Sequence, residues 1–354
     1  MKLRDDDSVS CEPWRSPAAP RRILAMRFQA LGDTIITLPY LLSMRRRFPE
    51  AELHFLTREE VCQVPAAVDL FDRVIALGGG RSLHLQLLSA ACKMPWLLAQ
   101  RYDLVLDLQN HRFSRWIRKL IAPRAWAEFD CHSPRSAGER NRRTIAAAID
   151  CRPTLDTGLA LRGGGPNVDA LLCKHGWKPD HDFVVLNPAG YSPSRAWPIE
   201  SYCEFARSWI ARHPRTQMVL LLLPSLRSKA ERIAAALGDA CIDLTGQADQ
   251  LQAFAIVGRA RLVLSEDSGL MHMAWVQGTP TLALFSSSRK DWSSPQGPWS
   301  DCLDSSDLPC GPCGLEVCKF GDNRCLTRYP AAQVLERAEK LARAQPLTRC
   351  APAQ

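Results

Sequence analysis

The sequence predicts an α/β protein with two domains, each built on a mostly parallel sheet. Short apolar runs of strand length alternate with helix-compatible amphipathic runs, and this alternation occurs once in each half of the chain. A glycine-rich break at 163–165, followed by Pro166, separates the two series. The length of 354 residues also favours two domains over one.

In the first half, apolar runs predict strands, and the amphipathic segments between them predict helices. The predicted strands cover 23–27, 52–57, 73–77 and 104–108. The predicted helices cover 34–48 and 82–100, and a third begins near Arg112. Further apolar runs at 126–129 and 146–149 complete this half.

The same alternation restarts in the second half. The predicted strands cover 183–186, 217–223, 241–244, 262–265 and 281–285. The predicted helices cover 199–212, 228–237, 251–258 and 271–276. A last amphipathic stretch at 331–344 predicts a helix that crosses back to the first domain.

These patterns divide the chain into five segments. We expect a disordered tail at 1–20, a first domain at 21–160 and a linker at 161–180. A second domain at 181–330 and the crossing helix with its tail at 331–354 complete the chain.

Composition narrows the class of function. The formal net charge is +8, a modest excess that suits acidic small molecules or an anionic membrane surface. The chain contains no recognised nucleic-acid-binding module, so we expect no nucleic-acid partner. The apolar runs are too short to span a bilayer, and the first 20 residues lack the apolar core of a signal peptide. A cytoplasmic location is therefore expected.

Most of the fourteen cysteines are scattered singly, but four lie close together near the C-terminus. They are Cys310, Cys313, Cys318 and Cys325. Their spacing opens with C-x-x-C but matches no standard zinc-finger pattern. A structural metal, bridged cysteines and free thiols all remain open as alternatives, in each case remote from the chemistry.

In open parallel sheets, ligands bind outside the carboxyl ends of the strands, and three such loops have unusual compositions. In the loop after 262–265, Asp267 or Ser268 can cap the following helix, and Gly269 permits close approach of the backbone. The first free N–H groups of that helix form an anion site, to which His272 can add a donor. A plain cap and a buried core histidine are the alternatives.

The loop at 187–198 combines Asn187 and Gly190 with hydroxyl groups and a cation, Arg195. An arginine can bind a diphosphate through two parallel hydrogen bonds. Because two anion-suited loops occur at equivalent strand ends of one domain, we favour ligand binding over a plain surface arginine.

The first loop, at 27–34, carries Gly32 and Asp33. Asp33 suits the N-cap of the next helix, and it also suits a general base at the carboxyl end of a strand, facing the cleft between the domains. The two roles are compatible. The chain has no Walker A or G-x-G-x-x-G motif, and Asp180-His181-Asp182, which has D-x-D spacing, precedes its strand instead of following it.

Several of these segments, in this order, resemble glycosyltransferase family 9, and the resemblance runs from about residue 22 to residue 340. The matching blocks are RFQALGDT at 27–34, FPEAEL at 48–53, YDLVLDLQ at 102–109, NPAG at 187–190, RAWP at 195–198, LTG at 244–246, DSG at 267–269 with His272, and 278–280. The cysteine cluster, with Phe320-Gly321 inside it, is similar to that of heptosyltransferase II-type members.

The resemblance implies a GT-B architecture, in which two Rossmann-like domains face a cleft. It implies transfer of heptose from ADP-heptose to the lipopolysaccharide inner core, with inversion at the anomeric centre and transient contact with the cytoplasmic face of the inner membrane. Asp33 would be the base. Arg195, Asp267, Ser268, Gly269 and His272 would bind the donor diphosphate, and Asn187 and Gly190 belong to the same donor site.

Charge stabilisation on a leaving diphosphate can come from a helix N-terminus and a cation. We therefore expect no required cofactor and no catalytic metal. The segment 224–228 departs from the family pattern near the nucleotide ribose, so another nucleotide sugar or glycan acceptor remains an alternative. A non-catalytic nucleotide-binding protein and a redox or metal sensor built on the cysteines are alternatives from other classes.

Overall fold

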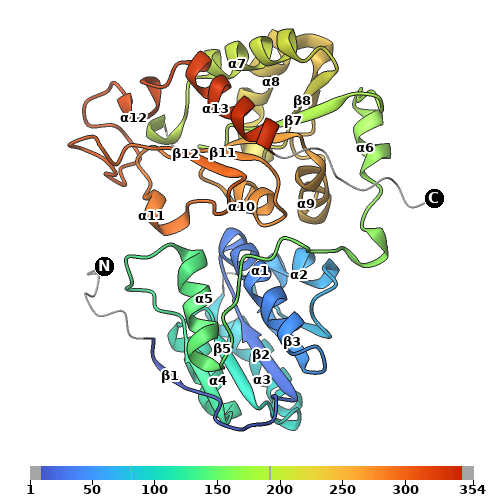
Figure 1. Ribbon diagram of the computed structural model, residues 1–354, viewed down its shortest axis with the longest axis vertical. Helices are drawn as coiled ribbons and strands as arrows, with labels where there is room; N and C mark the ends of the chain where they lie inside the picture. Colours follow the sequence, from blue (N-terminus) through green and yellow to red (C-terminus); the bar gives the residue numbers. More distant parts are fainter. Residues whose placement is uncertain (1–8, 81, 191–192, 345–354) are drawn as a thin grey trace. The chain divides into compact units, whose positions relative to one another are not determined.

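The structure is a computed structural model that describes residues 9–80, 82–190 and 193–344. The chain forms two compact units, Met1–Gly164 and Gly165–Gln354 (Figure 1). Each unit has its own six-stranded sheet. The prediction of two α/β domains with mostly parallel sheets is confirmed.

The sheet of the first unit has the strand order β1-β6-β5-β2-β3-β4. Its strands are β1 Cys11–Glu12, β2 Arg22–Met26, β3 Glu52–Arg58, β4 Arg73–Leu77, β5 Leu104–Asp107 and β6 Ala125–Glu128. Its α-helices are α1 Leu31–Arg47, α2 Gln63–Ala67, α3 Leu83–Ala99, α4 Arg112–Ile121 and α5 Ala137–Ala148. Short 3₁₀ turns, η1 Glu59–Val61 and η2 Arg162–Gly164, complete the unit.

All neighbouring strands of this sheet are parallel except β1, which pairs antiparallel with β6. The expected disordered tail at 1–20 is therefore wrong from residue 9 onward, because β1 adds an edge strand and the Trp14 N–H donates to the Ala148 carbonyl. Residues 1–8 lie outside the described residues. The apolar run at 146–149 ends helix α5 and adds no strand.

The core on one side of this sheet is built from period-two strand positions and from α3 and α4. Leu24 and Met26 of β2 point to the same side and pack with Met94 and Leu97 of α3 and Ile117 of α4. Helices α1 and α5 pack against each other. The helices therefore bury their apolar faces on the sheet in the layered manner typical of α/β units.

The second unit has the all-parallel strand order β12-β11-β10-β7-β8-β9. Its strands are β7 Asp182–Asn187, β8 Thr216–Leu220, β9 Cys241–Asp243, β10 Leu262–Glu266, β11 Thr281–Leu284 and β12 Ser300–Leu303. Its α-helices are α6 Val168–Lys174, α7 Ile199–Arg212, α8 Arg227–Leu237, α9 Gln250–Arg259, α10 Gly269–Trp275, α11 Lys290–Ser293, α12 Arg324–Thr327 and α13 Ala331–Ala344. The 3₁₀ turns are η3 Pro193–Arg195, η4 Pro224–Leu226 and η5 Gly238–Ala240.

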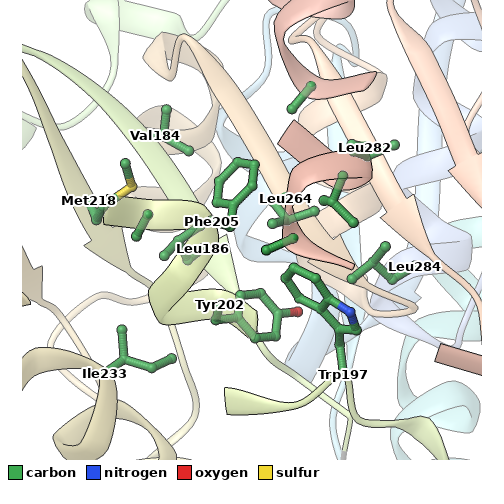
Figure 2. Close-up of a cluster of buried hydrophobic side chains, with 14 of the residues drawn as sticks. Val184, Leu186, Trp197, Tyr202, Phe205, Met218, Ile233, Leu264, Leu282 and Leu284 are labelled. Carbon is green, nitrogen blue, oxygen red and sulfur yellow. The ribbon is translucent and has the colours of Figure 1, made fainter. Parts of the chain in front are cut away.

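Large aromatic side chains fill the core between this sheet and α7 (Figure 2). The rings of Trp197 and Tyr202 meet edge to face with centroids 4.8 Å apart. The Trp197 indole N–H donates to the Tyr329 carbonyl at 3.0 Å, so this buried ring has its polar partner. The core thereby fixes the chain just after the loop at 187–196.

Helix α13 packs on α7 and on β10, β11 and β12. Its Val334 and Leu335 belong to the core of the second unit, and Glu339 pairs with Arg212 of α7 at 3.1 Å. The predicted helix exists, but this packing assigns it to the second unit, whereas the sequence pattern suggested that it crosses back to the first domain. Residues 345–354 lie outside the described residues.

The two sheets share one strand order. Numbered from its first parallel strand, the first unit reads 3-2-1-4-5 with an added antiparallel edge, and the second reads 3-2-1-4-5-6, which is the Rossmann order. The order reverses between β2 and β5 in the first unit and between β7 and β10 in the second. Ligands of such sheets bind outside the carboxyl ends of these strand pairs.

Candidate functional site

In the second unit, side-chain hydrogen bonds join the last residue of β7 to the end of β10 and to the turn that follows it, at the switch point. The Asn187 amide donates to Ser265 Oγ at 2.9 Å and to Ser268 Oγ at 2.7 Å. Asn187 and Ser265 are buried. One side chain therefore connects the two loops that the sequence suggested for donor binding.

Ser268 caps helix α10. Its backbone is extended, and its Oγ accepts a hydrogen bond from the Met271 N–H at 3.4 Å, so Ser268 and not Asp267 is the N-cap. Gly269 is the first helical residue. Asp267 is only partly buried and accepts a hydrogen bond from Ser293 Oγ at 3.4 Å. The turn therefore brings Asp267, Ser268 and Gly269 together at the start of the helix.

His272 has a defined tautomer. It is 5% exposed, and its Nδ1 lies 3.0 Å from the indole Nε1 of Trp275. Because an indole N–H only donates, Nδ1 must hold a lone pair, and the ring proton of neutral His272 lies on Nε2. The N–H donor of the neutral His272 ring therefore lies at Nε2.

Glu266 is a buried carboxylate that sequence reasoning missed. Its Oε1 accepts from the Trp197 backbone N–H at 2.6 Å, and its Oε2 accepts from the Gly190 N–H. Burial raises the pKa of Glu266 to about 7, against the lowering effect of these hydrogen bonds and of Lys229. Glu266 therefore fixes the β7 loop at both of its ends. The sequence contained one sign of this role: Glu266 is an acidic residue at the end of an apolar strand, directly before Asp267.

The loop leaves no space for a side chain at Gly190. A Cβ there would lie 2.2 Å from the Arg195 carbonyl oxygen and 2.6 Å from Glu266 Oε2. The Gly190 carbonyl in turn accepts from Lys229 Nζ at 2.7 Å. Gly190 thus permits the loop to pack closely on itself. The sequence suggested a different role for this residue, in the donor site.

Arg195 ends the turn η3 and is exposed, while its neighbours Ser194 and Trp197 are buried. The Ser194 hydroxyl donates to the Leu315 carbonyl at 2.5 Å. The backbone on both sides of Arg195 is therefore anchored, and its guanidinium lies on the solvent side of the β7 loop. Residues 191–192 of this loop lie outside the described residues.

In the first unit, Asp33 lies at the third position of α1 and is not the N-cap, which is Ala30. Asp33 Oδ2 accepts from the Ala30 backbone N–H at 3.2 Å and lies 2.7 Å from Arg27 Nη2. The Asp33 side chain is 39% exposed, whereas that of Arg27 is 7% exposed. A partly exposed carboxylate is thus held by a buried cation at the carboxyl end of β2.

Two guanidinium groups share one aromatic ring beside this carboxylate. Arg27 and Arg140 lie 5.1 Å and 4.8 Å from the centroid of Phe129. Burial, with a smaller effect of neighbouring Arg27, lowers the pKa of Arg140. Sequence reasoning missed both arginines, although Arg27 is the residue at which the predicted strand ends.

The loop after β5 holds the loop after β2. Gln109 Oε1 accepts from the backbone N–H groups of Phe28 and Gln29 at 3.0 and 3.1 Å. An open cavity of about 580 Å³ lies beside these loops. It is lined by Phe28, Gln29, Arg58, Glu60, Val61, Gln86, Gln109, His111 and Phe113. This cavity has a polar and aromatic lining and is large enough for a small ligand.

The four clustered cysteines are free thiols that line one cavity of about 30 Å³. Within the described residues, no group of three or more Cys, His, Asp or Glu side chains is arranged to hold a metal ion. The structure thus gives no support to the structural metal that the sequence left open at Cys310, Cys313, Cys318 and Cys325. Hydrogen bonds from the backbone of Phe320 and Asn323 lower the pKa of Cys318.

Comparison with known proteins fits this geometry. Residues 166–323 match the family described as glycosyltransferase family 9 (heptosyltransferase). Lipopolysaccharide heptosyltransferase 1 of Pseudomonas aeruginosa is 28% identical over 335 residues, which cover 84% of this chain and 88% of that protein. The second unit thus matches glycosyltransferase family 9, and the chain as a whole is similar to heptosyltransferases of that family. This similarity supports an enzyme of the glycosyltransferase class.

Solved structures of this family share the fold of the chain. The glycosyltransferase of family 9 from Veillonella parvula aligns with a TM-score of 0.78 at 19% identity, covering 92% of this chain and 98% of that one. Heptosyltransferase WaaC of E. coli, solved with ADP-2-deoxy-2-fluoro heptose, aligns with a TM-score of 0.65 at 18% identity, covering 90% and 99%. The predicted GT-B fold, with two Rossmann-like domains, is confirmed.

Proposed function

We propose that this chain is a family 9 glycosyltransferase that transfers a heptose from ADP-heptose to the inner core of lipopolysaccharide, with inversion at the anomeric carbon. The observation that carries the proposal is the joined pair of loops at the β7–β10 switch point, where Asn187 bonds to Ser268. The names of the relatives support the choice of sugar and acceptor, since the P. aeruginosa protein is a lipopolysaccharide heptosyltransferase and WaaC was solved with an ADP-heptose analogue.

The second unit would bind the donor. The backbone N–H groups at the start of α10, the Nε2–H of His272 and the guanidinium of Arg195 are the groups that suit two adjacent phosphates. Asp267, Ser268 and Gly269 shape this turn, and the ribose or sugar hydroxyls can donate to the Asp267 carboxylate.

The first unit would supply the base. In the proposed step, Asp33 takes the proton from the acceptor hydroxyl as the hydroxyl oxygen bonds to the anomeric carbon of the donor. The bond from that carbon to the phosphate oxygen breaks, and ADP leaves with the electron pair. Arg27 would hold the Asp33 carboxylate in the orientation that this transfer needs.

We further propose that the reaction needs no divalent metal. The charge that develops on the leaving diphosphate can be met by Arg195, by the N–H groups of α10 and by His272. The start of α10 and the His272 ring are held before the reaction by the Asn187 and Trp275 hydrogen bonds, and Glu266 holds the backbone of the loop that carries Arg195, so these parts of the site require little reorganisation.

The acceptor would be a lipid-linked core oligosaccharide at the cytoplasmic face of the inner membrane, with which the enzyme makes transient contact. No helix in the described part of the chain is long and apolar enough to cross a membrane. The cavity of about 580 Å³ beside Gln29 is the candidate place for acceptor sugars in the first unit.

A donor panel tests the proposal. The purified chain is incubated with lipopolysaccharide core acceptor and with ADP-heptose, ADP-glucose, UDP-glucose or GDP-mannose, and the product is measured by mass spectrometry. We expect transfer from ADP-heptose with inverted anomeric configuration. Transfer only from another nucleotide sugar would favour a different member of the same enzyme class, with the changed segment at 224–228 as the reason. Donor binding without any transfer would favour a non-catalytic protein.

A further inference from the structure

Helix α3 of the first unit exposes an apolar face to solvent. Its inner side packs on the sheet through Ala90, Met94 and Leu97. Its exposed positions are His84, Leu85, Leu87, Leu88, Ala91, Cys92, Pro95, Leu98 and Ala99. None of these is charged, although solvent-facing helix positions are normally polar. Leu85 and Leu88 are 55% and 61% exposed.

Helix α4 extends this apolar surface. It lies beside α3 in the ribbon (Figure 1). Its Trp116 and Leu120 are exposed. Six of the ten large hydrophobic side chains found exposed in the described residues lie on these two helices, namely Leu85, Leu87, Leu88, Leu98, Trp116 and Leu120. Such a concentration marks an interaction surface, whereas single exposed apolar residues need no explanation.

The charged side chains carried by the two helices themselves have one sign. Neither α3 nor α4 contains an acidic residue. Arg101, Arg112, Lys119 and Arg124 are exposed at the ends of the two helices or on α4 itself, and Lys93 lies half-buried on α3. Apolar side chains bordered by lysine and arginine are typical of a surface that lies in the interface of an anionic bilayer.

We infer that the exposed face of α3 and α4, called here the α3–α4 face, docks on an anionic lipid bilayer. A second copy of the chain is the less suitable occupant, because a symmetric contact would bring the two basic borders together. At 17 residues, α3 is about 25 Å long and lies along the sheet, so it would rest in the interface and not cross it.

The same two helices reach the cavity beside Gln29. Gln86 of α3 and Phe113 of α4 line this cavity, together with His111 just before α4. This part of the inference rests on the proposed function. A bilayer bound at the α3–α4 face would place the sugars of a lipid-linked acceptor near Gln29, next to Arg27 and Asp33 in the chain.

Vesicle binding tests the surface without any use of the reaction. The full chain and a Leu85→Ser/Leu88→Ser variant are sedimented with vesicles of equal parts phosphatidylcholine and phosphatidylglycerol, and with pure phosphatidylcholine. We expect the chain to bind the anionic vesicles, and the variant to bind about tenfold more weakly. A Leu315→Ser/Val317→Ser variant, which changes two exposed apolar side chains of the second unit, should bind like the parent.

Charge is tested separately with Lys119→Glu/Arg124→Glu. Reversing both charges should weaken binding to the anionic vesicles at least tenfold and leave weak binding to pure phosphatidylcholine unchanged. Equal vesicle binding by the parent and both variants would overturn the inference. So would concentration-dependent dimerisation in analytical ultracentrifugation that the leucine variant abolishes, because the face would then bind a second copy.

A delipidated core oligosaccharide separates this inference from the proposed function. If the parent fails to bind vesicles but transfers heptose to this water-soluble acceptor, the inference that the α3–α4 face docks on a bilayer is wrong, and the proposed function stands. If it binds vesicles as expected but transfers no heptose to any acceptor, the proposed function fails alone. Circular dichroism of the variants confirms that each retains its fold.

Discussion

Arg27 Nη2 lies 2.7 Å from Asp33 Oδ2, and this pair joins the end of β2 to the first turn of α1. The Arg27 guanidinium also donates to the Gln29 carbonyl at 2.9 Å and to the Leu108 carbonyl. One buried arginine thus connects the β2 loop, the β5 loop and the candidate base. The position of the Asp33 carboxylate depends on all three contacts.

We predict that Arg27→Ala lowers kcat about ten- to a hundredfold and leaves the KM for ADP-heptose nearly unchanged, because the base loses its orientation while the donor site lies in the other unit. Arg27→Lys should recover part of kcat, since it restores the charge without the fork of donors. Initial rates at varied donor concentration measure both constants. An equal fall in kcat for the exposed control Arg152→Ala would argue against positioning by Arg27.

Asp33→Asn should lower turnover by about a hundredfold or more, because the amide cannot take the acceptor proton. The dissociation constant of ADP, measured by isothermal titration calorimetry, should stay within about twofold of the parent value. The exposed Asp150→Asn serves as the matched control. Turnover near the parent rate in Asp33→Asn would end the assignment of Asp33 as the base.

Glu266 should make folding stability depend on pH. Burial raises its pKa from the ordinary 4.5 to about 7, so the folded protein keeps a proton that the unfolded chain releases first. The stabilisation is therefore present below pH about 4.5 and is lost as the pH rises through about 7. The largest change in the free energy of unfolding is on the order of 3 kcal/mol.

Glu266→Gln should remove most of this pH dependence, because the amide does not titrate. Urea denaturation from pH about 5 to about 8 measures the slope for the parent, for Glu266→Gln and for the exposed control Glu200→Gln. The control should keep the parent slope. If Glu266→Gln also keeps it, another group carries the pH dependence.

Removal of divalent metal should leave transfer intact. In EDTA the rate should stay within about twofold of the untreated rate, because amide, imidazole and guanidinium donors can meet the charge of the leaving diphosphate. Rates with EDTA and after addition of Mg²⁺ provide the measurement. Complete loss in EDTA that Mg²⁺ restores would show that a metal carries part of this charge.

Sequence patterns predicted the central strands well, because these strands are buried on both faces and read as continuous apolar runs. The runs at 104–108 and 262–265 correspond to β5 and β10 within one residue at each end. The edge strands β1 and β12 were missed for the opposite reason. β1 has only two residues, and three of the four residues of β12 are only partly buried, so neither shows a clear pattern.

The loops were predicted better than the contacts inside them. The sequence placed Asp33, Asn187 and Ser268 at strand ends, which follows from the chain alone. The roles of Arg27, Arg140 and Glu266 depend on partners up to 113 positions away, since Arg140 meets Arg27 beside Phe129. Local spacing carries no information about such contacts.

The shared strand order of the two sheets has a consequence for engineering. β2 is the topological counterpart of β7, and β5 is the counterpart of β10. Asp33 lies in the helix after β2, and Asn187 is the last residue of β7, so the corresponding ends of these two strands carry a carboxylate and an amide. The proposed roles then separate along the two units, with the donor diphosphate bound by the second unit and the acceptor proton taken by the first. Chimeras that exchange whole units between family members are then the natural way to alter the sugar and the acceptor independently.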